Sequence, residues 1–397
     1  MYKVILKKGR EKSVRNYHSW IFSGAIAKIE GDPAPGDIVS VSDRQGEFLA
    51  YGYYNPRPQI SIRVLDWDES AVIDRDWWNR KIEAAVNRRR AYFKDESETN
   101  AYRLIYSECD SLPGLIVDKY ADRLVLQSLT AGTEKMKQDI AEILVESLKP
   151  SAIYERSDTE SRALEGLDSV SGVLYEAKTA SSPLIIIENG LKFRVDIESG
   201  QKTGFYLDQR VNRLKAAEYA NGLDILDCFC HTGAFSIYAL RAGAKSSTLI
   251  DSSADCLSIA RENLGLNNID SGRADIVRGD VFERLRQFRE EGRQFDMVIL
   301  DPPKFAKSKS HLKKALTAYK DINLLGMQLL RPEGFLVTFS CSGAVDFDTF
   351  RTVLFWASAD SGRHLQIIEN LGPGPDHPEL ATFPEGSYLH GIIGRVI

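Results

Sequence analysis

Hydrophobic residues in the first part of the chain form short runs that are separated by turn-forming residues. Apolar stretches at 38–41, 48–51 and 60–64 alternate with segments rich in Gly, Pro, Asp and Asn. Short strands with regular breaks are typical of a small β-barrel or sandwich. We therefore expect residues 1–70 to form a small β-domain.

The middle of the chain combines helical and strand-like patterns. Residues 76–93 carry apolar positions at helical spacing, and a second helix is expected at 134–148. Strand-like runs occur at 115–118, 124–127 and 152–155. The pattern predicts a central α+β domain over residues 71–182.

Two apolar runs, 184–188 and 191–197, flank the dipeptide Asn189-Gly190. Asn-Gly between apolar runs is a strong signal for a β-hairpin with a two-residue turn. We expect residues 183–197 to be a hairpin that connects the central domain to the last part of the chain.

Strand-like and helical segments alternate regularly over residues 198–397. Five strands are expected at 223–229, 247–251, 274–280, 295–301 and 334–341, each followed by a helix, and two further strands at 364–371 and 388–396. The helix after the second strand is expected to end at Gly265. Regular alternation implies an α/β fold with a doubly wound, mostly parallel sheet and helices on both faces.

Composition places the chain among ordinary soluble proteins. It has 397 residues, 43% of them hydrophobic, with 51 Lys and Arg against 56 Asp and Glu and a formal charge of −5. At about 150 residues per domain, this length predicts two or three domains. The N-terminus lacks a signal-peptide pattern, and no apolar run approaches the roughly 18 residues of a membrane span. We expect a cytoplasmic protein without a membrane partner, and its five cysteines are too few and too scattered for a disulfide framework.

The first thirty residues are locally basic although the whole chain is acidic. Their candidate RNA-binding residues are Lys7, Lys8, Arg10, Lys12 and Trp20. A basic, aromatic-bearing small β-domain is typical of an RNA-binding module. A solvated charged face with core aromatics would give the same pattern, and the sequence favours neither interpretation.

Five consecutive strands of the last region end in residues whose side chains can act as acids, bases, nucleophiles or ligand contacts. Four end in an acid and the fifth in a cysteine: Asp227, Asp251, Asp280, Asp301 and Cys341. A parallel sheet brings the carboxyl ends of its strands to one rim, where ligands bind. Any one of these acids is explained by a turn or a helix cap, but the series favours a ligand site.

The loop after the first of these strands suits a positively charged cofactor. Gly233 permits a ligand to approach the backbone at a helix N-terminus, and the absence of a Gly-x-Gly-x-x-Gly pattern disfavours a dinucleotide. An acidic loop with few glycines suits S-adenosylmethionine, with Asp251 accepting from a ribose diol. Cys228 and Cys230 resemble half of a metal site, but no second cysteine pair completes it, so no metal is expected. The predicted cofactor contacts are Asp227, Phe229, Thr232, Gly233, Asp251, Ser252, Asp280, Val281 and Pro302.

The segment Asp301-Pro302-Pro303-Lys304-Phe305 is the most specific local signal. Its two prolines fix the backbone after the strand and remove two N–H donors, so a flat base would lie against this wall while Asp301 binds the edge of the base. A proline-rich turn without a ligand is the less favoured alternative. Lys304 and Lys307 head a lysine-rich stretch that suits phosphate contacts, although a solvated face would look similar.

Cys341 stands at the end of its strand and is followed by Ser342-Gly343. A lone cysteine is most often a small buried hydrophobe. At the same rim as Asp301, however, a thiolate would be an activated nucleophile.

Taken together, these motifs resemble the RlmI-type family of 23S ribosomal RNA cytosine-C5 methyltransferases over essentially the whole chain. The similar segments are KGREKS at 8–13, HSWIFSG at 18–24, LPGL at 112–115, KTGFYLDQR at 202–210, DPPKF at 301–305 and FSCSG at 339–343. The resemblance implies a PUA RNA-binding domain, a central domain and a Rossmann-like class I methyltransferase domain that uses S-adenosyl-L-methionine. It also implies that Tyr206, Gln209 and Arg210 pack over the cofactor. The chain departs from the family at Ser19, where Pro is frequent, and at 230–234, where CHTGA replaces the common SYTGG.

The family mechanism implied by this resemblance is covalent. Cytosine C5 is a poor nucleophile, and addition of a Cys341 thiolate to C6 would make it enamine-like. Asp301 would bind N3 and the exocyclic amine, and the target base would have to leave the stack. The sequence identifies no base that removes the C5 proton.

Three alternatives stay open at this stage. A related enzyme could methylate a base nitrogen such as guanine N2 through the Asp-Pro-Pro loop, without needing Cys341. A non-catalytic ribosome-assembly factor would bind RNA through residues 1–70 and merely retain the fold. A nicotinamide dehydrogenase is disfavoured because the glycine fingerprint is missing.

Overall fold

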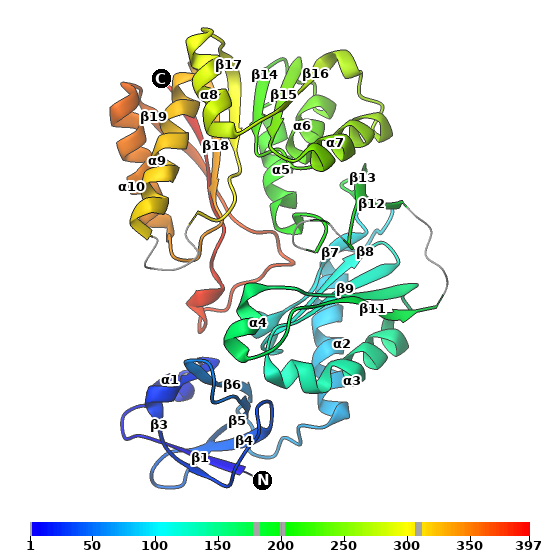
Figure 1. Ribbon diagram of the computed structural model, residues 1–397, viewed down its shortest axis with the longest axis vertical. Coiled ribbons are helices and arrows are strands. Elements are labelled where there is room, and N and C mark those ends of the chain that lie inside the picture. Colours follow the sequence, from blue (N-terminus) through cyan, green and yellow to red (C-terminus); the bar gives the residue numbers. More distant parts are fainter. Residues whose placement is uncertain (1, 178–182, 199, 201–202, 306–311) are drawn as a thin grey trace. The chain divides into compact units, whose positions relative to one another are not determined.

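The computed structural model describes residues 2–177, 183–198, 200, 203–305 and 312–397. The chain divides into two compact units (Figure 1). The first comprises Met1–Ile187, Val195–Leu207 and Pro375–Gly386, and the second comprises Glu188–Arg194, Asp208–Gly374 and Ser387–Ile397. In the described part of the chain, no helix is both long and apolar enough to cross a membrane.

The N-terminal part of the first unit is a six-stranded β-domain, as the sequence predicts. Its strands are β1 Tyr2–Leu6, β2 Trp20–Phe22, β3 Ile26–Glu30, β4 Ile38–Ser42, β5 Phe48–Tyr54 and β6 Ile60–Asp66, in the order β2-β6-β5-β4-β1-β3. Only β1 and β4 pair in parallel. Alternate residues such as Val39 and Val41 are fully buried in its core, which is why short alternating runs were sufficient to form it. The short helix α1, Lys12–Arg15, follows β1.

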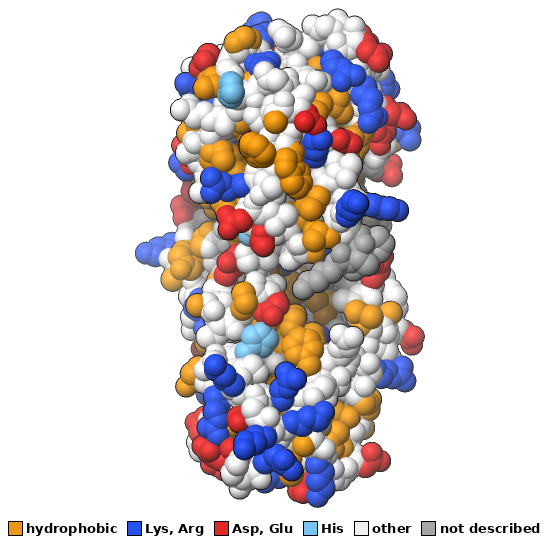
Figure 2. Space-filling model, turned by 90° about the vertical axis from the view of Figure 1, so that its left-hand side faces the viewer, with side chains coloured by type: hydrophobic (Ala, Val, Ile, Leu, Met, Phe, Trp, Pro, Cys, Tyr) orange, Lys and Arg blue, Asp and Glu red, His pale blue; other side chains and the backbone are white. Residues whose placement is uncertain are grey.

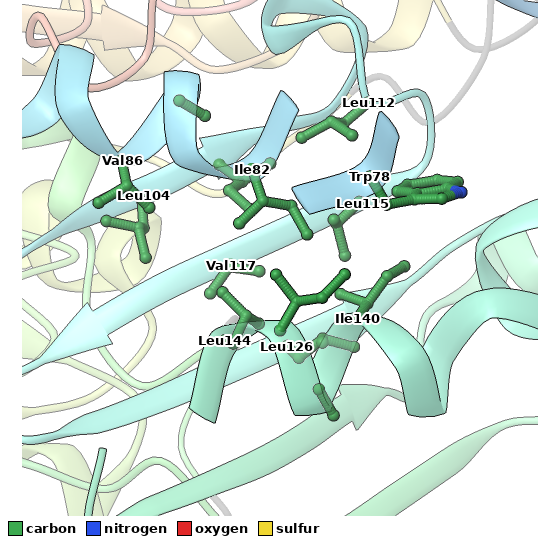
Figure 3. Packing of buried hydrophobic residues seen from close by; sticks show 14 of the residues in the cluster. Trp78, Ile82, Val86, Leu104, Leu112, Leu115, Val117, Leu126, Ile140 and Leu144 are labelled. Atoms are coloured by element: carbon green, nitrogen blue, oxygen red, sulfur yellow. The ribbon is translucent and has the colours of Figure 1, made fainter. Parts of the chain in front are cut away.

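A five-stranded sheet and three helices form the central part of the first unit. The strands β7 Ala101–Tyr106, β8 Leu115–Tyr120, β9 Arg123–Ser128, β10 Ala152–Ser157 and β11 Val170–Glu176 lie in the order β11-β10-β9-β8-β7. The helices are α2 Arg75–Tyr92, α3 Ala131–Leu148 and α4 Glu160–Glu165. Figure 3 shows Ile82 and Val86 of α2 and Leu144 of α3 packing with Val117 and Leu126 of the sheet. Burial of these apolar stripes holds both helices on the sheet.

The predicted hairpin is present as β12 Leu184–Glu188 and β13 Leu191–Val195. Asn189 and Gly190 have φ angles of 49° and 74°. A type I′ turn requires positive φ at both central residues, and this requirement explains the Asn-Gly sequence.

The second unit contains the doubly wound sheet that the alternating pattern predicts. Its strands are β14 Asp224–Cys228, β15 Ser246–Asp251, β16 Ala274–Arg278, β17 Phe295–Leu300, β18 Leu330–Ser340, β19 Leu365–Leu371 and β20 His390–Val396. They lie in the order β16-β15-β14-β17-β18-β20-β19, and the first five are parallel. The order reverses next to β14, and this is the position where open α/β sheets bind ligands.

Helices cover both faces of this sheet. They are α5 Arg210–Glu218, α6 Ala234–Arg241, α7 Ala254–Leu266, α8 Val281–Glu290, α9 Leu312–Gln328 and α10 Phe347–Ser361. The adjacent residues Leu249 and Ile250 of β15 point to opposite faces, where Leu249 packs with α7 and Ile250 packs with α8. The expected end of α7 at Gly265 was wrong by one residue, because the helix continues to Leu266 and is capped at Asn267.

Close packing of β5 against α3 gives a test of the first unit. A Cβ on Gly132 would lie 2.2 Å from Cγ of the Tyr53 ring, whereas a Cβ on Gly265 of α7 would meet nothing within 4 Å. We expect Gly132→Ala to lower the free energy of unfolding by about 1–3 kcal/mol through overpacking. The matched variant Gly265→Ala should raise it by up to about 1 kcal/mol through helix propensity. Urea denaturation checks both, and equal effects of the two variants would contradict the packing argument.

Candidate active site in the second unit

The carboxyl ends of four neighbouring strands bring the predicted residues to one rim. Asp251 ends β15, Asp227 lies near the end of β14, and Asp301 and Cys341 directly follow β17 and β18. Asp301 and Asp251 are close enough for their charges to raise the pKa of Asp227. The chain therefore gathers three carboxylates and one thiol at the edge where a ligand is expected.

Asp227 is a buried acid, and only one of its two carboxylate oxygens has a hydrogen-bond partner among the described residues. Its Oδ2 accepts hydrogen bonds from the backbone N–H and the hydroxyl of Ser236, at 3.1 and 2.6 Å. Its Oδ1 is buried and has no hydrogen-bond partner among the described residues, and the same holds for Oγ1 of Thr232. Burial raises the pKa of Asp227 to about 7, against the opposing hydrogen bonds from Ser236. A buried, partly unsatisfied carboxylate is suited to a cationic donor such as the amino group of S-adenosylmethionine.

The loop between β14 and α6 has an unusual backbone. Phe229, His231 and Gly233 have φ angles of 60°, 50° and 80°. A Cβ on Gly233 would lie 3.0 Å from a Leu249 methyl group. Two non-glycine residues with positive φ store conformational strain, and such strain is concentrated at ligand sites. The loop therefore favours a backbone cradle at the start of α6.

Asp251 holds this loop in place through backbone hydrogen bonds. Its Oδ2 accepts from the N–H of His231 and its Oδ1 accepts from the N–H of Ser253, both at 2.9 Å. The carboxylate is therefore fixed in orientation at the end of β15. Its predicted role towards a ribose diol stays a prediction.

Asp301 is held by Gln209, a contact that the sequence did not indicate. Gln209 donates from Nε2 to Oδ1 of Asp301 at 2.9 Å, and its own Oε1 accepts from Nδ2 of Asn212 at 2.6 Å. Gln209 and Asn212 are both buried. Their spacing of three residues at the start of α5 is the signal that could have linked them. Gln209 was predicted as a cofactor contact, and in this structure its amide orients the acid.

Cys341 lies beside the Asp-Pro-Pro segment. Its Sγ donates to the carbonyl oxygen of Pro302 at 3.5 Å, a contact between the residues that follow β18 and β17. Cys341 is half-buried, whereas burial raises the pKa of Cys228 and Cys230 well above the usual range. The next residue, Ser342, is 3.2 Å from the hydroxyl of Tyr319 through its Oγ. The cysteine with access to a substrate at this rim is therefore the one that the sequence indicated.

Other predicted cofactor residues take varied positions. Asp280 is exposed and caps α8 by accepting from the N–H of Glu283 at 3.1 Å, and Val281 is buried in the core. Ser252 is exposed, whereas Pro302 and Arg210 are buried. Tyr206 belongs to the first unit, where it is half-buried. The described residues contain no group of three or more His, Cys, Asp or Glu that could hold a metal ion.

The predicted RNA-binding residues are mostly exposed. Figure 2 shows Lys and Arg side chains gathered over the N-terminal β-domain, at the lower end of the view. Lys7, Lys8, Arg10 and Lys12 are exposed there, and Trp20 is half-buried. Lys304 is exposed in the second unit, and Lys307 lies outside the described residues.

Comparisons with known proteins agree with this architecture. A model of PUA-like domains matches residues 4–67, and a model of S-adenosylmethionine-dependent methyltransferases matches residues 170–386. The chain is 45% identical to "Ribosomal RNA large subunit methyltransferase I" of Shewanella amazonensis over 99% of both chains, and 45% identical to the protein of that name in Aeromonas hydrophila, over 99% of this chain and 98% of the relative.

A solved structure shows the same fold. The chain is similar to SMU.776, a putative methyltransferase complexed with SAH, with a TM-score of 0.87, 20% sequence identity and 100% of both chains covered. The expected fold, a PUA-like domain followed by a Rossmann-like methyltransferase domain, is thereby confirmed. S-adenosylmethionine is the cofactor of this domain family.

The raised pKa of Asp227 gives a test of the cofactor site. Ionised Asp227 is the better acceptor for the cationic amino group, so cofactor affinity should rise as pH rises through about 7. Asp227→Asn should bind S-adenosylmethionine about 10- to 100-fold more weakly at pH 8, because a hydrogen bond to a charged group contributes about 1.5–3 kcal/mol. Isothermal titration calorimetry from pH 6 to 8.5 checks this, with the exposed Asp255→Asn as control. A flat pH profile in the native protein would exclude Asp227 from cofactor binding.

The same group predicts how stability depends on pH. Its folded-state pKa of about 7 lies above the ordinary value of 3.8, so protonated Asp227 favours the folded state. This contribution is complete below about pH 4 and is lost as pH rises towards 7. Between pH 4 and 8 the native protein should therefore lose stability that Asp227→Asn keeps. The free energy of unfolding of Asp227→Asn, relative to that of the native protein, should rise over this range. Urea denaturation without cofactor measures it, and a constant difference would contradict the raised pKa.

Proposed function

Because the chain belongs to the family of ribosomal RNA large subunit methyltransferases I, we propose that it methylates C5 of a cytosine in 23S ribosomal RNA. The observation that carries the C5 assignment is the half-buried Cys341 thiol, 3.5 Å from the carbonyl oxygen of Pro302, which directly follows Asp301. Methylation of a ring carbon needs a covalent nucleophile, whereas methylation of an exocyclic nitrogen does not. A thiol beside the base-binding acid therefore favours carbon over nitrogen.

In this proposal, each residue at the rim has a separate role in the reaction. The Cys341 thiolate adds to C6 of the cytosine, so a C6–S bond forms and electron density moves to C5. Asp301, oriented by Gln209, accepts from the exocyclic amine, and its protonated carboxyl group donates its proton to N3, which neutralises the negative charge that the thiolate brings into the ring. S-adenosylmethionine supplies the methyl group that C5 accepts. Removal of the C5 proton by a base then restores the double bond, and the C6–S bond breaks.

The cofactor is assigned to the loop after β14 and its neighbours. Asp227 Oδ1 and Thr232 Oγ1 are the unsatisfied buried atoms that its amino-acid end would bind. Gly233 and Phe229 shape the backbone cradle, and Asp251 lies where a ribose would be bound. Ser252, Asp280, Val281, Pro302 and Arg210 complete the proposed set of contacts in the second unit.

RNA binding is assigned to exposed cations and to one aromatic residue of the β-domain. Lys7, Lys8, Arg10 and Lys12 are exposed on a domain that matches the PUA-like model. Cations on such a surface bind phosphates without regard to sequence and position the RNA. Lys304 would make a similar contact beside the catalytic segment.

Replacement of Cys341 tests the covalent step. Cys341→Ala should leave S-adenosylmethionine binding within about twofold of the native value and reduce transfer of a labelled methyl group to 23S rRNA to background. Cys256→Ala, at the other half-buried cysteine, should keep full activity. Robust methylation by Cys341→Ala would refute the nucleophile, and a methyl group found on a base nitrogen after digestion and mass analysis would support the nitrogen-methyltransferase alternative. A native protein that fails to bind S-adenosylmethionine would favour a non-catalytic assembly factor.

Replacement of Gln209 tests the orientation of Asp301. Gln209→Ala removes the donor that lies 2.9 Å from Asp301, and a misplaced catalytic group costs about 10- to 100-fold in rate. We expect kcat to fall by this factor, and Asn212→Ala to act in the same direction with a smaller effect. Steady-state kinetics with direct cofactor titration separates the roles, because a residue that only binds cofactor would change the cofactor Kd and leave kcat at saturation unchanged.

A further inference from the structure

The first unit contains a pocket of about 600 Å³, and of its lining residues only Trp20 has been given a role above. It lies where the N-terminal β-domain meets the central domain. Trp20 and Phe22 of β2 and Arg63 of β6 line it from one side, and Glu108 and the α4 residues Leu164 and Glu165 line it from the other. Its volume is within the range of small-ligand sites.

The walls of this pocket offer apolar surface to a flat ligand. Phe22 is 45% exposed and Leu164 is 72% exposed, although both are large hydrophobic residues. The ring of Trp20 lies edge-on to that of Phe22, with their centroids 6.4 Å apart. Exposed aromatic and aliphatic side chains around one hollow mark a binding surface, and a planar aromatic body would cover them best.

The floor of the pocket is a network of ion pairs and hydrogen bonds within the protein. Arg63 donates to Glu108 at 2.7 Å and to Glu165 at 3.1 Å, and Nε1 of Trp20 also donates to Glu108 at 2.7 Å. Burial opposes ionisation of Glu108, but Arg63 and hydrogen bonds from Ser107 and Trp20 hold its pKa below the usual value. Nε of Arg63 is buried and has no acceptor among the described residues. Both carboxylates already have partners, so the floor is not a site for a cation.

We propose that this pocket binds one unstacked nucleotide of the RNA substrate, at a position other than the methylated base. The base lies against Phe22 and Leu164, and the exposed Arg57, which also lines the pocket, faces the backbone phosphate. The inference rests on the proposed function only in that the substrate is RNA. Unstacked bases held on aromatic side chains are a general mode of RNA recognition.

Charge on the same domain favours RNA over a peptide as the occupant. Lys7, Lys8, Arg10 and Lys12 are exposed on the β-domain that supplies Trp20 and Phe22. Lys7 lies near the pocket, because its Nζ donates to the carbonyl oxygen of Gly24, two residues after Phe22, at 2.9 Å. Such cations suit the phosphates of an RNA. The two sites differ in kind, because the lysines bind backbone whereas the pocket binds a base. They are expected to respond differently to salt.

The test uses the full chain and naked 23S rRNA, with dissociation constants measured at several salt concentrations. Stacking on one side chain corresponds to a factor of about 5 to 100 in affinity. Phe22→Ala should weaken binding by a factor in this range, and Leu164→Ala should weaken it by a smaller factor because apolar contact is lost. Neither variant should change the slope of log K against log salt, because no phosphate contact is lost. Lys8→Ala should instead lower that slope. Tyr92→Ala, at an aromatic residue that is 63% exposed and outside the pocket, is the matched control and should bind like the native protein.

Two results would overturn the proposal. One is native affinity of both Phe22→Ala and Leu164→Ala for the naked RNA. The other is a loss seen only with assembled ribosomal subunits, which would make a protein the occupant. Because binding is measured without methyl transfer, failure of the C5 assignment leaves this test intact.

Discussion

Parallel pairing of β14, β17 and β18 is the constraint on which the candidate active site depends. Leu300 pairs with Cys228 on one side and with Thr338 on the other, so the residues that follow these strands emerge side by side. This register brings the Cys341 thiol to the carbonyl of Pro302. Because side chains alternate between the two faces of a sheet, a shift of one residue would turn the chemistry-bearing side chains away from each other.

The rim of this sheet combines unpaired buried polar atoms with a strained backbone in one loop. Oδ1 of Asp227 and Oγ1 of Thr232 are buried without partners among the described residues, and Phe229 and His231 adopt positive φ angles. Native proteins pair nearly all buried polar groups, so unpaired groups and strain in one loop need an explanation. A ligand that supplies the missing donor and acceptor explains both features.

In the first unit, buried ion pairs and hydrogen bonds join the β-domain to the central domain. Arg63 of the β-domain bonds to Glu108 and Glu165 of the central domain, and Asn55 also donates to Glu165. Because removal of one partner would leave an uncompensated buried charge, such contacts hold the β-domain in a defined position on the central domain. The pocket at this junction is therefore preorganised, which lowers the entropic cost of holding a nucleotide.

The sequence by itself determined the elements and the end of the sheet at which the chemistry lies. Strand and helix patterns, the Asn189-Gly190 turn and the residues after successive strands follow from local periodicity, since a parallel sheet aligns its strand ends without further information. Only the tertiary structure decided which hydrogen bonds each acid makes. Asp280 caps a helix, Asp227 is left half satisfied, and Gln209 turns to Asp301. The pocket around Trp20 also emerged only on folding, because its walls come from segments far apart in the chain. Packing selects one rotamer from the many that a free side chain adopts, and no local pattern records that choice.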